Sequence, residues 1–250
     1  MCLVSGVFGA ARFSKELKSS NILVLLAPGA SVLNYSKAEF ERLAEYDTVA
    51  INFFSLHDFN ADYYLIEPHD QSLDFFSSKP SSKLNGKVLY KGYSSPSSFC
   101  WMVKNLFTAK TKGIDVLLMK ESGCYFSEDC HGLDQHFDDC FNLGGNSLIY
   151  MIMLAIKARY QSVILCGFDM DGNYFYNDPR AAVAAVLKAK SRGLDAVQHN
   201  MVGNFELQNQ VKNKIIELVK IEKQKTPDFT VSVFKGHGVL AEVLDRSELS

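Results

Sequence analysis

Residues 143–178, LGGNSLIYMIMLAIKARYQSVILCGFDMDGNYFYND, combine a glycine-rich entry, two apolar runs and a polar loop. Residues 148–156 are apolar on almost every side, which predicts a helix buried between layers. Residues 162–166 form a short apolar run, as expected of a central parallel strand. In open α/β sheets, ligands bind beyond the carboxyl ends of the strands. The expected active-site edge is therefore marked by the polar residues that follow this strand, namely Asp169, Asp171, Asn173, Tyr174 and Tyr176.

Similar patterns along the rest of the chain predict an alternation of strands and helices. Further strands are expected at residues 21–26, 47–51, 62–66, 87–90, 115–119 and 230–234. Helices are expected after Ser36, which can cap the first of them, and at residues 99–108, 179–190, 205–223 and 239–244. Successive strands with polar ends suggest a parallel order with one shared ligand edge.

The predicted fold class is therefore α/β, with a single Rossmann-like domain over residues 1–250 and a mostly parallel sheet. Long irregular stretches often form lids or acceptor-binding loops. We expect a lid region of this kind from residues 120–142 and 170–204.

The composition excludes several classes of protein. The net charge is −2, from 26 basic and 28 acidic residues, which gives no electrostatic footprint for binding nucleic acid. A hydrophobic content of 47% implies a folded core rather than global disorder. The six cysteines form no CxxC pair, and we expect reduced thiols in a cytoplasmic protein.

The sequence predicts no membrane span, because no apolar run approaches the necessary length. The first residues contain an apolar patch but lack the clean charged start of a signal peptide. Arg12, Lys15 and Lys18 cluster there, which leaves peripheral contact with a membrane as an alternative. An ordinary solvated N-terminal segment is the favoured interpretation.

Two groups of residues resemble metal sites, and neither is favoured. Asp169-Met-Asp171 has the DxD form with which many glycosyltransferases hold a nucleotide diphosphate through a divalent cation. The motif is short, and we prefer one aspartate capping a turn and the other solvated. No common zinc pattern has the spacings of the second group, Cys124, Cys130, His131, His136 and Cys140. We therefore expect neither a metal nor another cofactor.

Several strand-end residues could contact a nucleotide. Residues 27–31, Ala-Pro-Gly-Ala-Ser, follow the first buried strand, and their single glycine fits a mononucleotide-binding turn or an ordinary βα turn. Asn52 ends the next strand and could bond a sugar or base, or cap its own turn. Tyr174 and Tyr176 could donate hydrogen bonds to a phosphate, or pack over the sheet edge.

Two histidines are candidates for a general base. His199 lies in a polar loop before the long helix, where a side chain with a pKa near neutrality can accept a proton. Its position alone favours an ordinary surface histidine. His237 is the second candidate, and its flanking glycines allow a close approach to a ligand or simply a tight turn.

Together these stretches resemble the bacterial CMP-sialic-acid-dependent sialyltransferases of the Campylobacter type, and related Maf and MptE-like pterin diphosphokinase domains look similar. Residues 147–151 and 165–169 resemble the family's Ser-Gly-Val-Tyr-Met opening and its Gly-Ile-Asp strand end. Residues 27–31 resemble its Gly-Asn-Gly-Pro-Ser turn, and residues 49–52 resemble its second strand. The resemblance implies a GT-A-like variant of the Rossmann-like fold.

The resemblance also implies roles for individual residues. His199 would match the general base, and Tyr174 and Tyr176 would stand in for the tyrosines that bind the departing phosphate. Asn52 and Ser147 would contact the CMP part or the donor sugar. The full set implied to bind the nucleotide or donor is Gly29, Ser31, Asn52, Gly145, Asn146, Ser147, Asp169, Tyr174 and Tyr176.

The resemblance covers most of residues 21–245, and residues 70–142 are too divergent to align. Three positions within it depart from the family pattern. Pro28 replaces the turn Asn, Gly144 replaces an Arg near the acceptor, and Glu67 falls where an Asn binds the donor. CMP-Kdo or another CMP-nonulosonate is therefore as credible a donor as CMP-sialic acid.

The expected activity is an inverting transfer of a sialic-acid-like or Kdo-like sugar from CMP to a bacterial surface glycan or glycolipid. Such an enzyme would serve lipopolysaccharide or capsule biosynthesis from the cytoplasmic side of the inner membrane, and homo-oligomers are left open. One alternative is a Mg²⁺-dependent pterin diphosphokinase with Asp169 and Asp171 as ligands. Another is a non-catalytic module that binds a nucleotide or sugar and needs no base.

Overall fold

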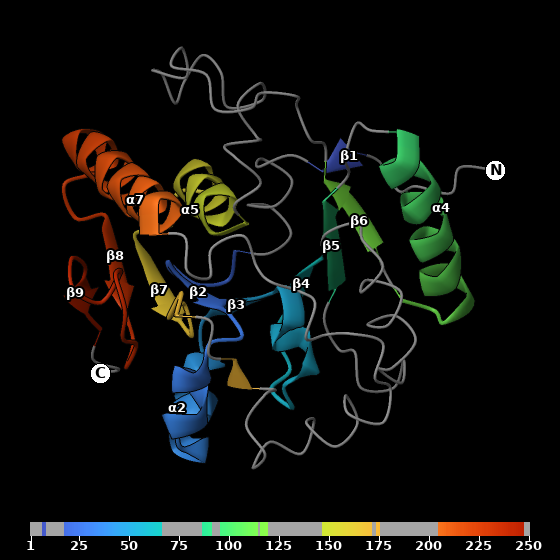
Figure 1. Cartoon of the computed structure of the whole chain (residues 1–250), viewed down its shortest axis with the longest axis horizontal. Helices are drawn as coiled ribbons and strands as arrows, with labels where there is room; N and C mark the ends of the chain where they lie inside the picture. Colours follow the sequence, from blue (N-terminus) through green and yellow to red (C-terminus); the bar gives the residue numbers. More distant parts are fainter. Residues whose placement is uncertain are drawn as a thin grey trace. The chain divides into compact units, whose positions relative to one another are not determined.

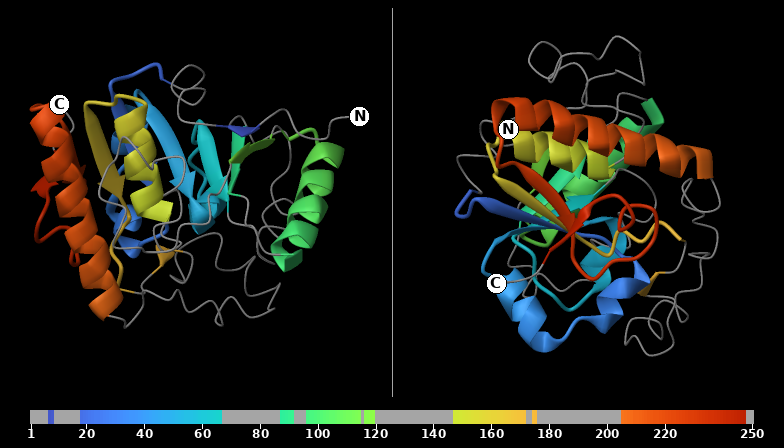
Figure 2. Two further views of the ribbon diagram at one scale, coloured as in Figure 1. Left: turned by 90° about the horizontal axis from the view of Figure 1, so that it is seen from above. Right: turned by 90° about the vertical axis from the view of Figure 1, so that its left-hand side faces the viewer.

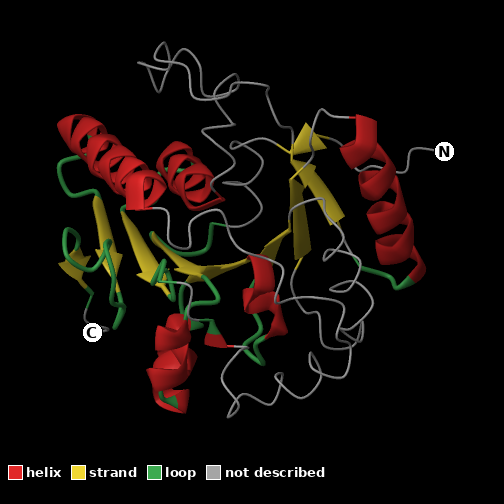
Figure 3. Cartoon of the chain, in the orientation of Figure 1, coloured by secondary structure: helices red, strands yellow, loops and turns green. Residues whose placement is uncertain are grey.

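The structure is a computed structural model that describes residues 7–8, 18–66, 87–91, 96–114, 116–119, 147–171, 174–175 and 205–247. The chain divides into two compact units. Unit 1 comprises Met1–Lys18 and Asn60–Ala158, and unit 2 comprises Ser19–Phe59 and Arg159–Ser250. Figure 1 shows their elements in chain order, and Figure 3 distinguishes the helices from the strands.

The described residues of unit 1 form parallel strands in the order β1-β6-β5-β4. The strands are β1 (Val7–Phe8), β4 (Tyr63–Ile66), β5 (Lys87–Lys91) and β6 (Val116–Met119). The helix α4 (Pro96–Thr111) lies between β5 and β6 in the chain and provides the crossover connection that two parallel neighbouring strands need. The helix α5 (Ser147–Lys157) is buried from Ser147 to Ile156. This confirms the buried helix predicted over residues 148–156.

The described residues of unit 2 form parallel strands in the order β3-β2-β7-β8-β9. The strands are β2 (Ile22–Leu26), β3 (Asp47–Ile51), β7 (Ser162–Cys166), β8 (Thr230–Val233) and β9 (Asp245–Arg246). Leu26 is aligned with both Ala50 and Cys166, so β2, β3 and β7 end at the same edge. The short 3-10 helices η1 (Ala30–Asn34) and η2 (Asn52–Leu56) begin beyond this edge.

Two helices lie on opposite faces of the sheet of unit 2, as the right-hand view of Figure 2 shows. The shorter one, α2 (Lys37–Leu43), begins with a capping box. The Ser36 hydroxyl accepts a hydrogen bond from the Glu39 backbone, and the Glu39 carboxylate accepts one from the Ser36 backbone. The cap predicted at Ser36 is therefore confirmed.

The longer helix of unit 2, α7 (Phe205–Lys225), covers the other face. Val211, Ile215 and Leu218 are buried, and their spacing places them on one side of the helix. The amphipathic pattern predicted over residues 205–223 is confirmed. Polar and charged residues occupy most of the exposed side.

The mostly parallel α/β fold predicted from the sequence is confirmed, and among the described residues one predicted element is wrong. Residues 239–244 form turns rather than a helix. Ala241 N donates to Gly238 O and Val243 N to Leu240 O, a three-residue spacing that closes turns, and one bond of helical spacing joins Leu244 N to Leu240 O. So short a segment forms too few helical bonds to offset the cost of nucleation. The chain then enters β9, which, like β1, is too short to carry a periodic pattern.

Some predicted segments lie outside the described residues: the lid at 120–142, the helix at 179–190 and most of the stretch 170–204. Among the helices that are described, none combines the length and apolarity needed to cross a bilayer.

At the amino ends of the strands of unit 2, one buried carboxylate joins three segments. Asp47 opens β3, and it is 2% exposed. Its Oδ2 accepts hydrogen bonds from the backbone N of Ser19 and Ser20 at 3.0 and 3.1 Å, and from the Tyr160 hydroxyl at 2.8 Å. A buried charge is stable only with partners of this kind. Asp47 therefore ties β3 to the segments that precede β2 and β7.

The variant Tyr160→Phe removes one donor from Asp47 and keeps the aromatic ring. We expect it to lower the free energy of unfolding by about 1.5–3 kcal/mol, the scale of a hydrogen bond to a charged group. Urea unfolding followed by circular dichroism measures this loss. Tyr46→Phe is the matched control because Tyr46 is partly exposed, and it should change stability much less. Equal losses in the two variants would contradict the role given to Asp47.

Candidate functional site

The candidate site consists of three turns that follow the carboxyl ends of neighbouring strands in unit 2. The β2 turn is residues 27–31, the β7 turn is residues 167–171 and the β8 turn is residues 235–238. Because β7 pairs in parallel with both β2 and β8, the three turns meet at one edge of the sheet. Ligands of α/β proteins bind at this kind of edge.

The β2 and β7 turns touch through their backbones. Ala27 N donates to Cys166 O, and Gly29 N donates to Gly167 O, both at 2.8 Å. A Cβ atom at Gly29 would collide with Gly167 O and with the Asp169 carboxylate. Gly167 has a φ of 72°, and a Cβ atom there would collide with Ala27 O. Both positions therefore require glycine.

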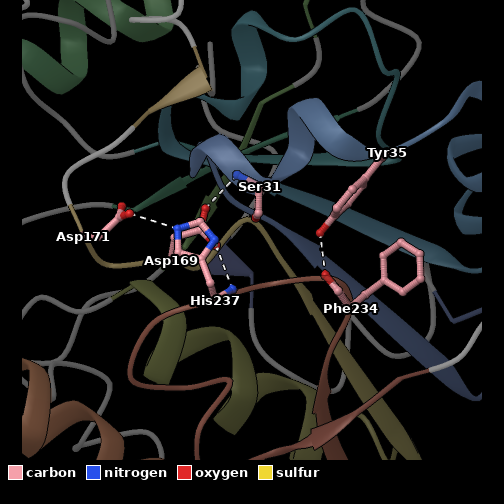
Figure 4. A network of polar contacts seen from close by, with 6 residues as sticks. All are labelled: Ser31, Tyr35, Asp169, Asp171, Phe234 and His237. Carbon is pink, nitrogen blue, oxygen red and sulfur yellow. Dashed lines mark hydrogen bonds and ion pairs between the residues drawn. The ribbon is translucent and has the colours of Figure 1, made fainter.

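The Asp169 carboxylate lies where the three turns meet, and its side chain is fully buried. Its Oδ2 accepts a hydrogen bond from Ser31 N of the β2 turn at 2.8 Å. Its Oδ1 faces the β8 turn, 3.6 Å from Nδ1 and 3.5 Å from the backbone N of His237. A Cβ atom at Gly238 would collide with Asp169 O, so the β8 turn also packs directly on this residue. Figure 4 shows Asp169 with Ser31 and His237.

His237 lies between two carboxylates of the β7 turn (Figure 4). Its Nε2 is 2.9 Å from Asp171 Oδ2, and its side chain is 53% exposed. The hydrogen bond with Asp171 raises the pKa of His237, and the charges of Asp169 and Asp171 add to this against an opposing effect of partial burial. The environment therefore favours the imidazolium form, in which both ring nitrogens donate.

The β7 turn is strained at Met170, which has a φ of 59°. This left-handed conformation costs a non-glycine residue about 1–2 kcal/mol. Gln208, a buried residue of α7, donates its Nε2 to Met170 O at 2.8 Å. The turn is thus held by the β2 turn, the β8 turn and α7 together. Strain that is fixed from several sides is common at functional sites.

Tyr174 follows the β7 turn and forms an antiparallel bridge with Gly29. Its neighbour Phe175 donates its backbone N–H to Pro28 O at 3.0 Å. Burial raises the pKa of Tyr174 to about 12, with the charge of Asp171 as the second cause. The phenol is therefore protonated at neutral pH and can donate a hydrogen bond to an anion.

Two buried groups next to these turns have structural rather than chemical roles. Tyr35 donates its hydroxyl to Phe234 O at 2.6 Å (Figure 4). Burial raises the pKa of Tyr35 far above its usual range, and Cys166 and Asp169 raise it further. Burial also raises the pKa of the free Cys166 thiol, which makes it a poor nucleophile.

Part of the predicted set of donor-binding residues comes together in this site: Gly29, Ser31, Asp169 and Tyr174. Asn52 opens η2, after β3 of the same unit. Ser147 is the first residue of α5 in unit 1, and it is buried. The remaining predicted residues lie outside the described residues, and they are Gly145, Asn146, Tyr176 and the candidate base His199.

Of the residues considered as metal ligands, the structure describes the two aspartates of the DxD motif and not the zinc group. The five residues of the zinc alternative lie outside the described residues. Asp169 of the DxD pair is buried and Asp171 is partly exposed. Within the described ranges, no group of three His, Cys, Asp or Glu side chains is placed to hold a metal ion.

Gln208 is a contributor to the site that sequence reasoning missed. It lies on the buried side of α7, three residues before Val211 and seven before Ile215. A polar side chain on the apolar stripe of an amphipathic helix is a detectable signal, because it must find a partner once buried. The sequence does not show that this partner is the carbonyl of Met170.

Comparisons with known proteins show the fold. No protein-family model and no curated protein matches the chain significantly. The monofunctional alpha-2,3-sialyltransferase Cst-I from Campylobacter jejuni aligns with a TM-score of 0.58 and 17% identity, over 93% of this chain and 82% of that chain. An alpha-2,3-sialyltransferase from Campylobacter jejuni in apo form gives a TM-score of 0.51 and 16% identity with the same coverage.

A third solved structure also aligns with most of the chain. It is the sialyltransferase CstII from Campylobacter jejuni in complex with a substrate analogue, cytidine-5'-monophosphate. The TM-score is 0.50 and the identity 15%, over 91% of this chain and 85% of that chain. At these identities the matches show that the chain shares the α/β fold of these proteins.

The raised pKa of His237 can be tested by titrating its imidazole signal by NMR. We expect a pKa above the ordinary value of about 6.5 in the parent chain and a lower pKa in the Asp171→Asn variant. Asp58→Asn, which changes an exposed aspartate of the same unit, should leave it unchanged. An unchanged pKa of His237 in the Asp171→Asn variant would contradict the hydrogen bond between His237 and Asp171.

The same contact predicts how stability depends on pH. Because folding raises the pKa of His237, its stabilising contribution is complete below the unfolded value of about 6.5. The contribution is lost as the pH rises through the higher pKa of the folded state. The parent chain and His237→Ala should therefore differ more in free energy of unfolding in weak acid than in weak base.

Proposed function

We propose that the chain is a glycosyltransferase that uses a CMP-activated sugar as its donor. The observation that carries this proposal is the carboxyl edge of unit 2, where the β2 turn leaves no room for a side chain at Gly29 and contacts Asp169 and Tyr174. A glycine-containing turn after a parallel strand is a common nucleotide site. The fold shared with a sialyltransferase solved with cytidine-5'-monophosphate supports the choice of nucleotide.

The proposed reaction is an inverting displacement. His199 removes the proton of an acceptor hydroxyl, and the oxygen attacks the anomeric carbon of the donor. The bond from that carbon to the phosphate oxygen breaks, and its electron pair leaves with CMP. Tyr174 and Tyr176 donate hydrogen bonds to the departing phosphate. The pKa of Tyr174, raised to about 12, supports this role because it keeps the phenol a donor at neutral pH.

The proposed site needs no metal, since the leaving group is a monophosphate and the phenols of Tyr174 and Tyr176 stabilise its charge by hydrogen bonds. Asp169 already accepts a hydrogen bond from Ser31, and Asp171 is paired with His237. These partners compete with a metal for the two carboxylates. In the competing pterin diphosphokinase function, the carboxylates would bind Mg²⁺ and ATP would be the substrate.

The resemblance in sequence supports further proposals about substrates. Asn52 and Ser147 would contact the nucleotide or the donor sugar, which is sialic-acid-like or Kdo-like. The acceptor would be a bacterial surface glycan or glycolipid, reached from the inner face of the cytoplasmic membrane.

A thermal-shift panel tests the class of nucleotide. CMP, CDP, UDP, ADP and ATP are added to the chain with and without Mg²⁺, and CMP should raise the Tm most, with no effect of Mg²⁺. A ligand at about a hundred times its Kd stabilises the folded state by about 2.7 kcal/mol, so the shift should be several degrees. A response to ATP only with Mg²⁺ would point to the diphosphokinase instead.

The variant His199→Ala tests the general base. Loss of such a base should lower the turnover number by about a hundred- to ten-thousand-fold, because an acceptor hydroxyl that keeps its proton is a weak nucleophile. Release of CMP from CMP-sialic acid or CMP-Kdo measures turnover, and calorimetry with CMP should find affinity unchanged. A His199→Ala variant with full turnover would remove this residue from the mechanism, and His237 would become the candidate.

A further inference from the structure

The β7 turn carries two carboxylates at the edge where the proposed donor adds more negative charge. Asp169 is buried, whereas the Asp171 side chain is 29% exposed. A CMP-sugar brings a phosphate to this edge, and a nonulosonate sugar brings a carboxylate as well. Like charges in partly buried surroundings repel one another strongly. An anionic donor therefore binds here only if the charge of the turn is offset.

His237 is a basic side chain that lies close to both of these carboxylates. Its Nε2 lies 2.9 Å from Asp171 Oδ2, and its Nδ1 lies 3.6 Å from Asp169 Oδ1. The other charged side chain of the β8 turn, Lys235, pairs with Glu39 at the start of α2. Figure 4 shows the imidazole lying between the two aspartates.

The charge of Asp171 also acts on Tyr174, which is the proposed hydrogen-bond donor to the phosphate of the CMP-sugar. The negative charge of Asp171 is the second cause of the raised pKa of that phenol. Tyr174 follows Asp171 by three residues, and its backbone bridges Gly29, which packs on the Asp169 carboxylate. A phosphate bound to the Tyr174 hydroxyl would therefore lie at the same edge as the two carboxylates. The charge state and position of Asp171 should consequently affect phosphate binding.

We propose that His237 is a positioning residue of the proposed transferase. It neutralises Asp171 and holds its carboxylate in place, so that Tyr174 can bind the phosphate of the donor. The inference rests on the proposed function and adds a residue to its site. His237 acts through Asp171 and Tyr174 rather than on the reacting atoms. The same contact fixes the β8 turn to the β7 turn, so the test must separate charge from mere stability.

Calorimetry with CMP and with cytidine separates the two effects, because cytidine lacks the phosphate. Measurements near pH 6 keep the imidazole largely protonated. His237→Ala should weaken CMP binding by about tenfold and leave cytidine binding unchanged. Adding Asp171→Asn to this variant removes the exposed charge, and CMP affinity should recover.

Two further variants complete the set. Lys235→Ala is the matched control, because it changes a charged residue of the same turn that pairs with Glu39 instead. It should keep the preference of the parent chain for CMP over cytidine. If His237→Ala does not fold, His237→Gln carries the test, since its amide can reach Asp171 without supplying charge and should give the same selective loss.

Each result bears on one of two conclusions. If the parent chain binds neither CMP nor cytidine, the proposed function fails and this inference fails with it. If the parent chain binds CMP but the His237 variants lose CMP and cytidine affinity equally, the residue is only structural and the inference alone is overturned. Unchanged CMP affinity, or no recovery with Asp171→Asn, would overturn it as well.

Discussion

A carboxylate that is buried at the end of a strand must find donors for its oxygens, and at Asp169 these come from two other turns. Ser31 N of the β2 turn donates a hydrogen bond to one oxygen, and His237 of the β8 turn faces the other. Removing such partners from a buried charge is strongly destabilising. The Asp169 side chain therefore contributes to the position of all three turns. The glycines around it follow from the same constraint, because Gly29 and Gly238 let the neighbouring backbones approach Asp169 closely.

Much of the fold could be predicted because its signals are local. The buried helix α5 and the strand β7 are continuous apolar runs, and the register of parallel strands then fixes which polar residues share an edge. Gly29, Asp169 and Tyr174 could be assigned to that edge for this reason. The sequence predicts a helix at 239–244 where the structure has turns, because the apolar spacing fits a helix while the length does not sustain one.

The rest of the site depends on contacts between segments that are distant in sequence. The pairing of His237 with Asp171 joins residues 66 positions apart, and that of Gln208 with Met170 joins residues 38 apart. No periodic pattern encodes such pairs. The left-handed backbone of Met170 is equally hidden, since methionine has no intrinsic preference for it. Asp169 and Asp171 look alike in sequence, yet one is buried within the turns and the other is partly exposed beside a histidine.

The backbone bonds between the β2 and β7 turns have a consequence for how such a chain can diverge. Ala27 and Gly29 donate to Cys166 and Gly167, so these contacts use main-chain atoms that every residue except proline possesses. Side chains elsewhere in the two turns can therefore change without breaking them. An inserted or deleted residue in either turn, by contrast, would shift each donor away from its acceptor. Distant relatives with this edge should thus agree in the spacing between strand and turn far better than in residue identity, and alignments anchored on loop length should find them more readily.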